Sequence, residues 1–372
     1  MKRIKTTKFA VAALCLAGLA ALSACGGGSS GETAPSTKIS SVRVFGDSLA
    51  DSGTFGFKFT VQSTDNYIFA ERIALTYGQT LCNYYTATGA DTFVPNPKPG
   101  CTNYAIGGGV INTATVANPT TNLKGIQFQL AAGAATAYSA NEMVMIDGGG
   151  NDAAALVGAF LQTQLSPGAA SNAQWVGLLG TMSSAAAAAA ADPVNSGVLY
   201  MTALADQFYS TITATVLNKG ATHVVIANIP DITLTPRFQM VLAGIGAAKG
   251  AATQQQLQAV FQGWLSAFNK EIAAKASADS RVLVVDIYSN FQDEVNNPAQ
   301  YSLTNVKDPS CPADATLGAD NLPTYTFPKC TPAAASPGWQ TALFSDSFHP
   351  TPYGHQLAAR LIALGIAQKG WL

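Results

Sequence analysis

Short apolar runs recur along the chain, and the segments between them have a different period. Residues 39–45 form a β-branched run that ends at a Gly-bounded turn, and unbroken apolar runs follow at 143–150, 222–230 and 281–288. An apolar run without alternation is typical of a strand that is covered on both faces. The pattern therefore predicts the strands of a buried parallel sheet.

The intervening segments have apolar residues three and four positions apart, which predicts helices. We expect helices at 67–77, 126–138, 198–217 and 254–276, and an Ala-rich helix around 185–191. Strands that alternate with helices imply a three-layer α/β/α sandwich around a central parallel sheet. Ligands bind such sheets beyond the carboxyl ends of the strands, so the residues that follow each run are the candidates for function.

Composition favours a globular protein and argues against one class of partner. The chain has 372 residues, of which 48% are hydrophobic and 11% charged, which is ample material for a large core. Lys and Arg total 20 against 21 Asp and Glu, and no long basic run follows residue 8, so nucleic acid is not expected as a partner. We find no internal repeat and no boundary of a second domain.

The N-terminal residues have the pattern of an export signal. Lys2, Arg3, Lys5 and Lys8 precede an apolar stretch at 9–22. The alternative is an uncleaved membrane anchor, but the stretch is shorter than the ~20 residues that span a bilayer. We therefore expect the segment to be removed.

The tetrapeptide Leu-Ser-Ala-Cys at 22–25 resembles the lipobox of bacterial lipoproteins, in which the cysteine becomes the lipidated first residue. The alternative is ordinary cleavage after Ala24, although Leu22 is bulky for the usual small-x-small site. Lipidation of Cys25 would attach the protein to a membrane. The expected boundaries are a lipoprotein-type signal peptide at 1–24, a Gly/Ser-rich tether at 25–38 and the folded domain at 39–372.

Four cysteines remain once Cys15 and Cys25 are set aside, and an even number in an exported chain predicts two disulfides. They are Cys82, Cys101, Cys311 and Cys330. Three pairings are open, of which the two local ones close the shortest loops. A zinc site built from all four is the alternative, although no Cys-x-x-Cys pair supports it. The second local pair falls in a proline-rich segment at 308–338, which we expect to be an ordered, disulfide-pinned loop.

Three residues suggest nucleophilic catalysis. Ser48 follows the first predicted strand in a Gly-Asp-Ser-Leu turn, and a serine is useful there only if a base takes its proton. The chain has three histidines, and His349 alone has a carboxylate, Asp346, three residues before it. That spacing suits a base and the group that orients it. His223 begins a strand and His355 lies on a predicted terminal helix, so we expect packing or surface roles for them.

Four sequence blocks stand in an order that resembles the GDSL (SGNH) lipolytic enzymes, in the branch of lecithinase-like and haemolysin-like esterases. The blocks read FGDSLADSG at 45–53, NYAIGGG at 103–109, GGGND at 148–152 and DSFHPTPYGH at 346–355. The resemblance covers residues 42–359 and implies a flavodoxin-like SGNH-hydrolase fold that needs no cofactor and no metal.

Carried over by position, the resemblance implies a catalytic triad of Ser48, Asp346 and His349. It also implies an oxyanion hole formed by the backbone amides of Ser48 and Gly108 and the side-chain amide of Asn151, each a donor for developing negative charge. The alternatives are a turn glycine at 108 and a helix N-cap at 151. Asp47, Asp51 and Asp152 are expected to organise loops, and a metal site at Asp346, His349 and His355 is a further alternative.

The predicted activity is hydrolysis of carboxylic esters through an acyl-Ser48 intermediate. One alternative is transfer of the acyl group to an alcohol or sugar, and another is an inactive, surface-attached binding module. We expect a monomer that acts on an acyl ester or lipid and is held at the outer membrane or cell surface, or else secreted. The pocket walls are expected from 54–64, 153–196, 233–250 and 308–338.

Overall fold

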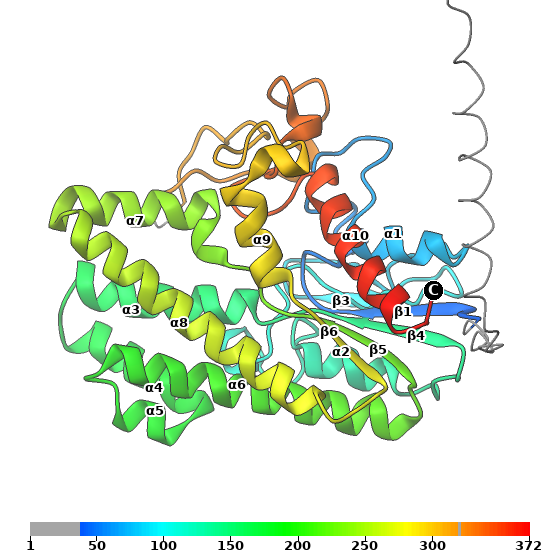
Figure 1. Cartoon of the computed structure of the whole chain (residues 1–372). Coiled ribbons are helices and arrows are strands. Elements are labelled where there is room, and N and C mark those ends of the chain that lie inside the picture. Colours follow the sequence, from blue (N-terminus) through cyan, green and yellow to red (C-terminus); the bar gives the residue numbers. More distant parts are fainter. Residues whose placement is uncertain (1–37, 319–320) are drawn as a thin grey trace, which may run out of the picture. The chain divides into compact units, whose positions relative to one another are not determined.

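The computed structural model describes residues 38–318 and 321–372, and a parallel sheet lies at its centre (Figure 1). Within these residues the sheet has four strands in the order β1-β4-β5-β6, all parallel. The strands are β1 (Ser41–Phe45), β4 (Glu142–Ile146), β5 (His223–Ala227) and β6 (Val282–Val285). Each lies inside or at the edge of a predicted apolar run, so the prediction of four buried parallel strands is confirmed.

Side chains along each strand point alternately to two hydrophobic cores. Val44, Met145 and Val225 belong to one core, whereas Phe45 and Ile146 belong to the other. Successive residues of a strand face opposite sides of a sheet, so unbroken apolar runs supply both cores at once. The three-layer arrangement predicted from the sequence is therefore confirmed.

Helices cover both faces of the sheet (Figure 1). One face packs against α1 (Phe69–Thr76) and α10 (Pro352–Gln368), which contact each other, and α9 (Ile287–Asn296) lies beside α10. The other face packs against α2 (Ile126–Gly133), α3 (Gly150–Leu165), α6 (Pro193–Thr215) and α8 (Ala251–Ala276). Three further helices, α4 (Ala169–Met182), α5 (Ser184–Ala188) and α7 (Pro236–Lys249), pack on the outside of this layer.

Helix α6 begins five residues before its predicted start. The Asp192 side chain accepts a hydrogen bond from the Asn195 N–H, and Pro193 occupies the first turn, where its missing N–H costs nothing. Capping therefore decided this boundary more than apolar periodicity did. Gly197 in the second turn is needed for packing, because a Cβ atom there would lie 2.1 Å from the Trp264 ring.

Strand β1 has a second neighbour that the apolar pattern did not predict. The Val44 N–H donates to Thr102 O at 3.0 Å, and the Tyr104 N–H donates to Val44 O at 2.8 Å. The chain that precedes Thr102 forms an antiparallel pair of strands, β2 (Tyr85–Ala87) and β3 (Phe93–Pro95). Backbone groups on both sides of β1 are therefore paired, although the 102–104 segment is too irregular to read as a strand.

Two disulfides join Cys82 to Cys101 and Cys311 to Cys330, so the prediction of two disulfides is confirmed, with the local pairing. Disulfides persist in oxidising compartments.

Short 3₁₀ turns occur at Thr113–Thr115, Leu217–Lys219, Ile232–Leu234, Pro298–Tyr301, Phe327–Lys329 and Trp339–Thr341. Among the described residues, no helix is both long and apolar enough to cross a bilayer. The predicted signal peptide, the predicted lipidation site at Cys25 and the predicted tether up to residue 37 lie outside the described residues.

Candidate active site

The turn after β1 presents Ser48 at the carboxyl end of the sheet. Gly46 has a φ of +151°, and a Cβ atom on it would lie 1.5 Å from Asp147 Oδ1, so only glycine fits there. The Gly46 N–H donates to Gln129 Oε1 at 2.9 Å, and Asp47 Oδ1 accepts the Leu49 N–H at 2.9 Å. These contacts fix the backbone on both sides of the serine, whose side chain is only 4% exposed.

His349 and Asp346 meet Ser48 in one hydrogen-bonded chain. The Ser48 Oγ lies 2.8 Å from His349 Nε2, and His349 Nδ1 lies 2.9 Å from Asp346 Oδ2. The other oxygen, Asp346 Oδ1, accepts the backbone N–H groups of Phe348 and His349 at 2.8 and 2.5 Å. The structure therefore brings the three predicted catalytic residues together in the order nucleophile, base and orienting acid.

The surroundings of Asp346 favour its ionised form. Burial alone raises the pKa of this carboxyl, but the charge of His349 and the hydrogen bonds from its ring and backbone outweigh burial and hold the pKa below its usual value. An ionised carboxylate accepts the Nδ1–H of His349 and stabilises positive charge on the ring.

The three predicted oxyanion donors lie on adjoining segments. Gly108 has a φ of +78°, and a Cβ atom on Gly109 would lie 2.7 Å from Gly46 O, so this loop packs directly on the nucleophile turn. Asn151, at the start of α3, donates one amide hydrogen to Gly109 O at 2.9 Å. In the part of the chain that the structure describes, the N–H groups of Ser48 and Gly108 have no hydrogen-bond acceptor. These donors are available to bind a developing oxyanion.

Two buried carboxylates hold the loops that carry these donors. Asp51 accepts the N–H groups of Gly53 and Thr54 with one oxygen and that of Gly107 with the other. Burial raises the pKa of Asp51 to about 6 despite these bonds. Its carboxyl thus links the turn after Ser48 to the glycine loop, which confirms its interpretation as a loop organiser.

Asp152 has a similar structural role. Its two oxygens accept the N–H groups of Ile111 and Asn112 at 3.0 and 2.7 Å, and burial raises its pKa to about 6. This carboxyl joins the start of α3 to the segment after the glycine loop. The interpretation of Asp152 as structural is confirmed.

A further carboxyl, Asp147, was not identified from the sequence. It follows β4 directly and lies buried against Asp47. Burial raises the pKa of Asp147 well above its usual value, and the neighbouring charge of Asp47 raises it further. Burial also raises the pKa of Asp47. Both oxygens of Asp147 are buried without a hydrogen-bond partner among the described residues, which adds to the cost of ionising this carboxyl.

His355 is buried, and its ring lies against the start of α1. Its Nδ1 accepts the Phe69 N–H at 3.4 Å. Burial, supported by the charge of Arg72, lowers its pKa to about 3, so the ring is neutral. Among the described residues no three His, Cys, Asp or Glu side chains, Asp346, His349 and His355 included, form a group that could hold a metal ion. His355 packs in the core.

Aromatic rings surround the base. The ring centroids of Phe59, Phe327 and Phe348 lie 5.2, 5.4 and 5.6 Å from that of His349. Gly107 makes room for the first of them, because a Cβ atom there would lie 2.2 Å from the Phe59 ring. The segments that hold Phe59 and Phe327 are among the predicted pocket walls, but nothing in the sequence singles out these two rings.

An apolar cavity of about 90 Å³ lies beneath the site. Its walls include the immediate neighbours of three site residues: Leu49 beside Ser48, Gly150 beside Asn151, and Phe348 beside His349. The other walls include the apolar side chains of Ile229, Ile232, Ile287, Phe291, Leu343 and Ile362 and the polar side chains of Asp47, Asp147, Asn228, Asn290, Glu294 and His355. The site therefore combines a small set of polar groups with apolar surroundings, as small-molecule sites usually do.

Comparison with known proteins assigns the chain to a family. The family model described as GDSL-like lipase/acylhydrolase matches residues 42–362, which is most of the chain and includes every block noted in the sequence. No curated protein matches the sequence. With the α/β/α fold and the arrangement of Ser48, His349 and Asp346, this match shows that the chain belongs to the GDSL-like lipase/acylhydrolase family.

Proposed function

We propose that the protein hydrolyses carboxylic esters through a covalent acyl-Ser48 intermediate. His349 Nε2 takes the proton of Ser48 Oγ as this oxygen attacks the ester carbonyl carbon. The carbonyl oxygen becomes an oxyanion that binds the N–H groups of Ser48 and Gly108 and the amide of Asn151. The tetrahedral intermediate expels the alcohol, which receives the proton from His349. Water then attacks the acyl-enzyme in the same way and releases the carboxylic acid.

The chain of contacts from Asp346 through His349 to Ser48 carries this proposal. Both of its distances fall within hydrogen-bond range, at 2.9 and 2.8 Å, and the family is that of lipases and acylhydrolases. The N–H groups of Ser48 and Gly108, which have no acceptor among the described residues, support the proposal. Preorganised N–H groups bind the carbonyl oxygen more strongly as negative charge develops on it.

The surroundings of the site favour esters with an apolar acyl group. Phe59, Phe327 and Phe348 enclose the base, and the cavity beneath the site has mainly apolar walls. Burying a methylene group contributes about 0.8 kcal/mol, so each added carbon that reaches these walls strengthens binding several-fold. We therefore propose that longer acyl chains are preferred to acetate.

We also propose that the protein is exported and held at a membrane by a lipid on Cys25. The two disulfides support an oxidising compartment, and the lipobox-like tetrapeptide supports lipidation. Mass spectrometry of the N-terminal peptide of protein from the native membrane tests this. An acylated Cys25 is expected, and an unmodified N-terminus at another residue would contradict it.

The function is tested by hydrolysis of p-nitrophenyl esters from acetate to palmitate, with wild type, Ser48→Ala and Ser52→Ala. Removal of a catalytic serine lowers kcat by about 10⁶-fold, so Ser48→Ala is expected to fall to the assay background. Ser52 lies in the same turn, and its buried hydroxyl has no partner among the described residues, so Ser52→Ala is the matched control and should retain activity.

Two other outcomes would change the proposal. Release of nitrophenol only when an alcohol acceptor is added would indicate acyl transfer in place of hydrolysis. A folded wild-type protein that attacks no ester under either condition would contradict catalysis and leave a binding role.

A further inference from the structure

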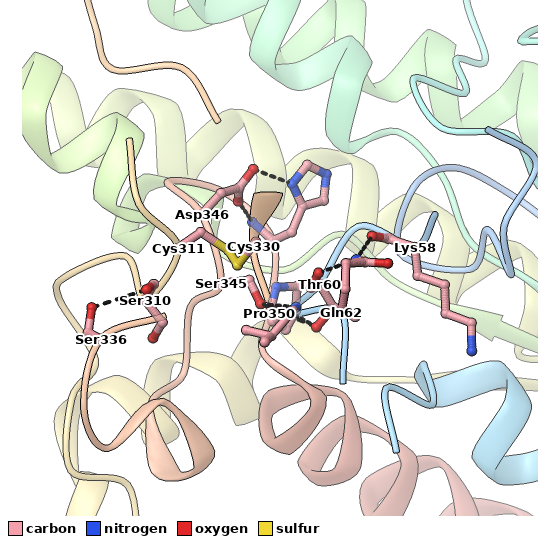
Figure 2. The surroundings of a disulfide bond; sticks show 12 residues. Lys58, Thr60, Gln62, Ser310, Cys311, Cys330, Ser336, Ser345, Asp346 and Pro350 are labelled. Carbon is pink, nitrogen blue, oxygen red and sulfur yellow. Dashed lines mark hydrogen bonds and ion pairs between the residues drawn. A yellow bond between two sulfur atoms is a disulfide. The ribbon is translucent and has the colours of Figure 1, made fainter. Parts of the chain in front are cut away.

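Ser345 is a fully buried serine that precedes Asp346, and it lies at the centre of a hydrogen-bond network (Figure 2). Its Oγ accepts the Val61 N–H at 3.1 Å, donates to Pro350 O at 2.9 Å and lies 3.2 Å from Thr60 Oγ1. Thr60 Oγ1 also donates to Pro350 O, at 2.9 Å. One hydroxyl thus joins the 60–61 segment to both ends of the loop that carries the acid and the base.

The main chain of Ser345 makes a second set of contacts. Its N–H donates to His349 O at 2.8 Å, which closes the loop on itself. Its carbonyl accepts the N–H groups of Ser310 and Cys311 at 2.9 and 2.6 Å. Cys311 is joined by the disulfide to Cys330 (Figure 2). The disulfide loop is therefore bonded directly to the residue before the catalytic acid.

The same disulfide also connects the 310–311 segment to the 60–62 segment. The Cys330 carbonyl accepts the Gln62 N–H at 2.8 Å, which leads back to Thr60 and Val61. Phe327, three residues before Cys330, packs on the disulfide and lies against the His349 ring. We call the network of Thr60, Ser345 and the Cys311–Cys330 disulfide the brace.

The loop held by the brace needs external support. Residues 342–351 contain no helix or strand, yet they must place His349 Nε2 within 2.8 Å of Ser48 Oγ, which is fixed to β1 on a distant part of the chain. The hydrogen bonds of Asp346 to Phe348 and His349 are local and cannot fix the loop relative to β1. A displacement of about 1 Å in such a site costs about 10²-fold in rate.

We propose that Ser345 is a positioning residue for the acid and base, and that the Cys311–Cys330 disulfide acts on catalysis through it. Ester hydrolysis therefore depends on the redox state of this disulfide, and not on that of Cys82–Cys101. The proposal rests on the function proposed above. It makes the brace a determinant of the position of His349, in addition to Asp346 and to the hydrogen bond from the Arg237 N–H to Ser347 O.

The first test replaces the hydroxyl groups of the brace. Ser345→Ala and Thr60→Val are expected to lower kcat by about 10- to 100-fold with KM changed less than twofold, since the substrate contacts remain. Thr60→Ser keeps the hydroxyl and should restore kcat. The low-field proton resonance of the His349–Asp346 hydrogen bond should weaken in Ser345→Ala and Thr60→Val. A lower melting temperature with unchanged kcat and an unchanged resonance would overturn the proposal.

The second test compares the disulfides, which both have a sequence separation of 19 residues and so constrain the unfolded chain to a similar extent. The paired variant Cys311→Ser/Cys330→Ser should lose kcat at a temperature where it is folded, whereas Cys82→Ser/Cys101→Ser should lose stability alone. Equal kcat losses, or none in the first variant, would overturn the proposal. A wild type without esterase activity would contradict the proposed function instead, and the resonance would still report on the brace.

Discussion

Glu294 should make the protein less stable as pH rises through neutrality. This side chain lies on α9 at the wall of the cavity, is 4% exposed and accepts one hydrogen bond, from Asn290 Nδ2 at 2.6 Å. Burial raises its pKa from 4.5 to about 7, and the Asn290 bond offsets only part of this. Between pH 4.5 and about pH 7, the folded protein therefore keeps a proton on Glu294 that the unfolded chain releases.

The size of the effect follows from that pKa. A rise from 4.5 to about 7 corresponds to about 3 kcal/mol at a pH above both values. Because the folded pKa is the higher one, this stability is fully present below pH 4.5 and is lost as pH rises through about 7. Between pH 5 and pH 8 the loss attributable to Glu294 is about 2–3 kcal/mol.

Urea unfolding at pH 5 and pH 8 measures this loss for wild type and Glu294→Gln. Glutamine keeps an acceptor for Asn290 and cannot ionise, so the change in unfolding free energy between the two pH values should be smaller in the variant by about 2–3 kcal/mol. Asp51 and Asp152, whose pKa values burial raises to about 6, act in the same direction and cancel in the comparison. Asp65→Asn, at an exposed carboxyl, is the control. An equal pH dependence in wild type and Glu294→Gln would refute the reasoning.

Three further substitutions test the site and the core. Asp346→Asn keeps an acceptor for the two backbone N–H groups but favours the wrong tautomer of His349, so kcat should fall by about 10⁴-fold in steady-state assays; a fall of less than tenfold would contradict the assigned role. Asn151→Ala should lower kcat by about 10²- to 10³-fold with little change in KM, and an effect on KM alone would argue against an oxyanion contact. Gly197→Ala places a Cβ atom 2.1 Å from Trp264 and should cost about 1–3 kcal/mol in urea unfolding, with kcat unaffected at temperatures where the variant is folded.

The sequence predicted the sheet and the position of the site because both depend on local patterns. The apolar runs at the four strands are unbroken, and such runs have few interpretations other than a sheet buried on both faces. Ser48, Asp346 and His349 occur in short blocks with a known order. Their meeting in space then follows from the rule that sites lie at the carboxyl ends of parallel strands.

The sequence did not reveal residues whose roles depend on strand register or on contacts between distant segments. Asp147 meets Asp47 only because Phe45 pairs with Ile146, which places Asp147 opposite Gly46. Asp147 does carry one signal in the sequence, since it is a carboxylate that directly follows a buried apolar run. Ser345 had no such signal, since its importance comes from partners at 60–61 and 310–311.

The separation of the nucleophile from its base also determines when the site can exist. Ser48 and His349 lie 301 positions apart, and the whole of β4, β5, β6 and their connecting helices is placed between them. A chain that is still being synthesised contains Ser48 early but lacks Asp346 and His349 until almost all residues have been added. Under the proposed mechanism, a product truncated before residue 346 has a nucleophile without a base and is expected to be inactive.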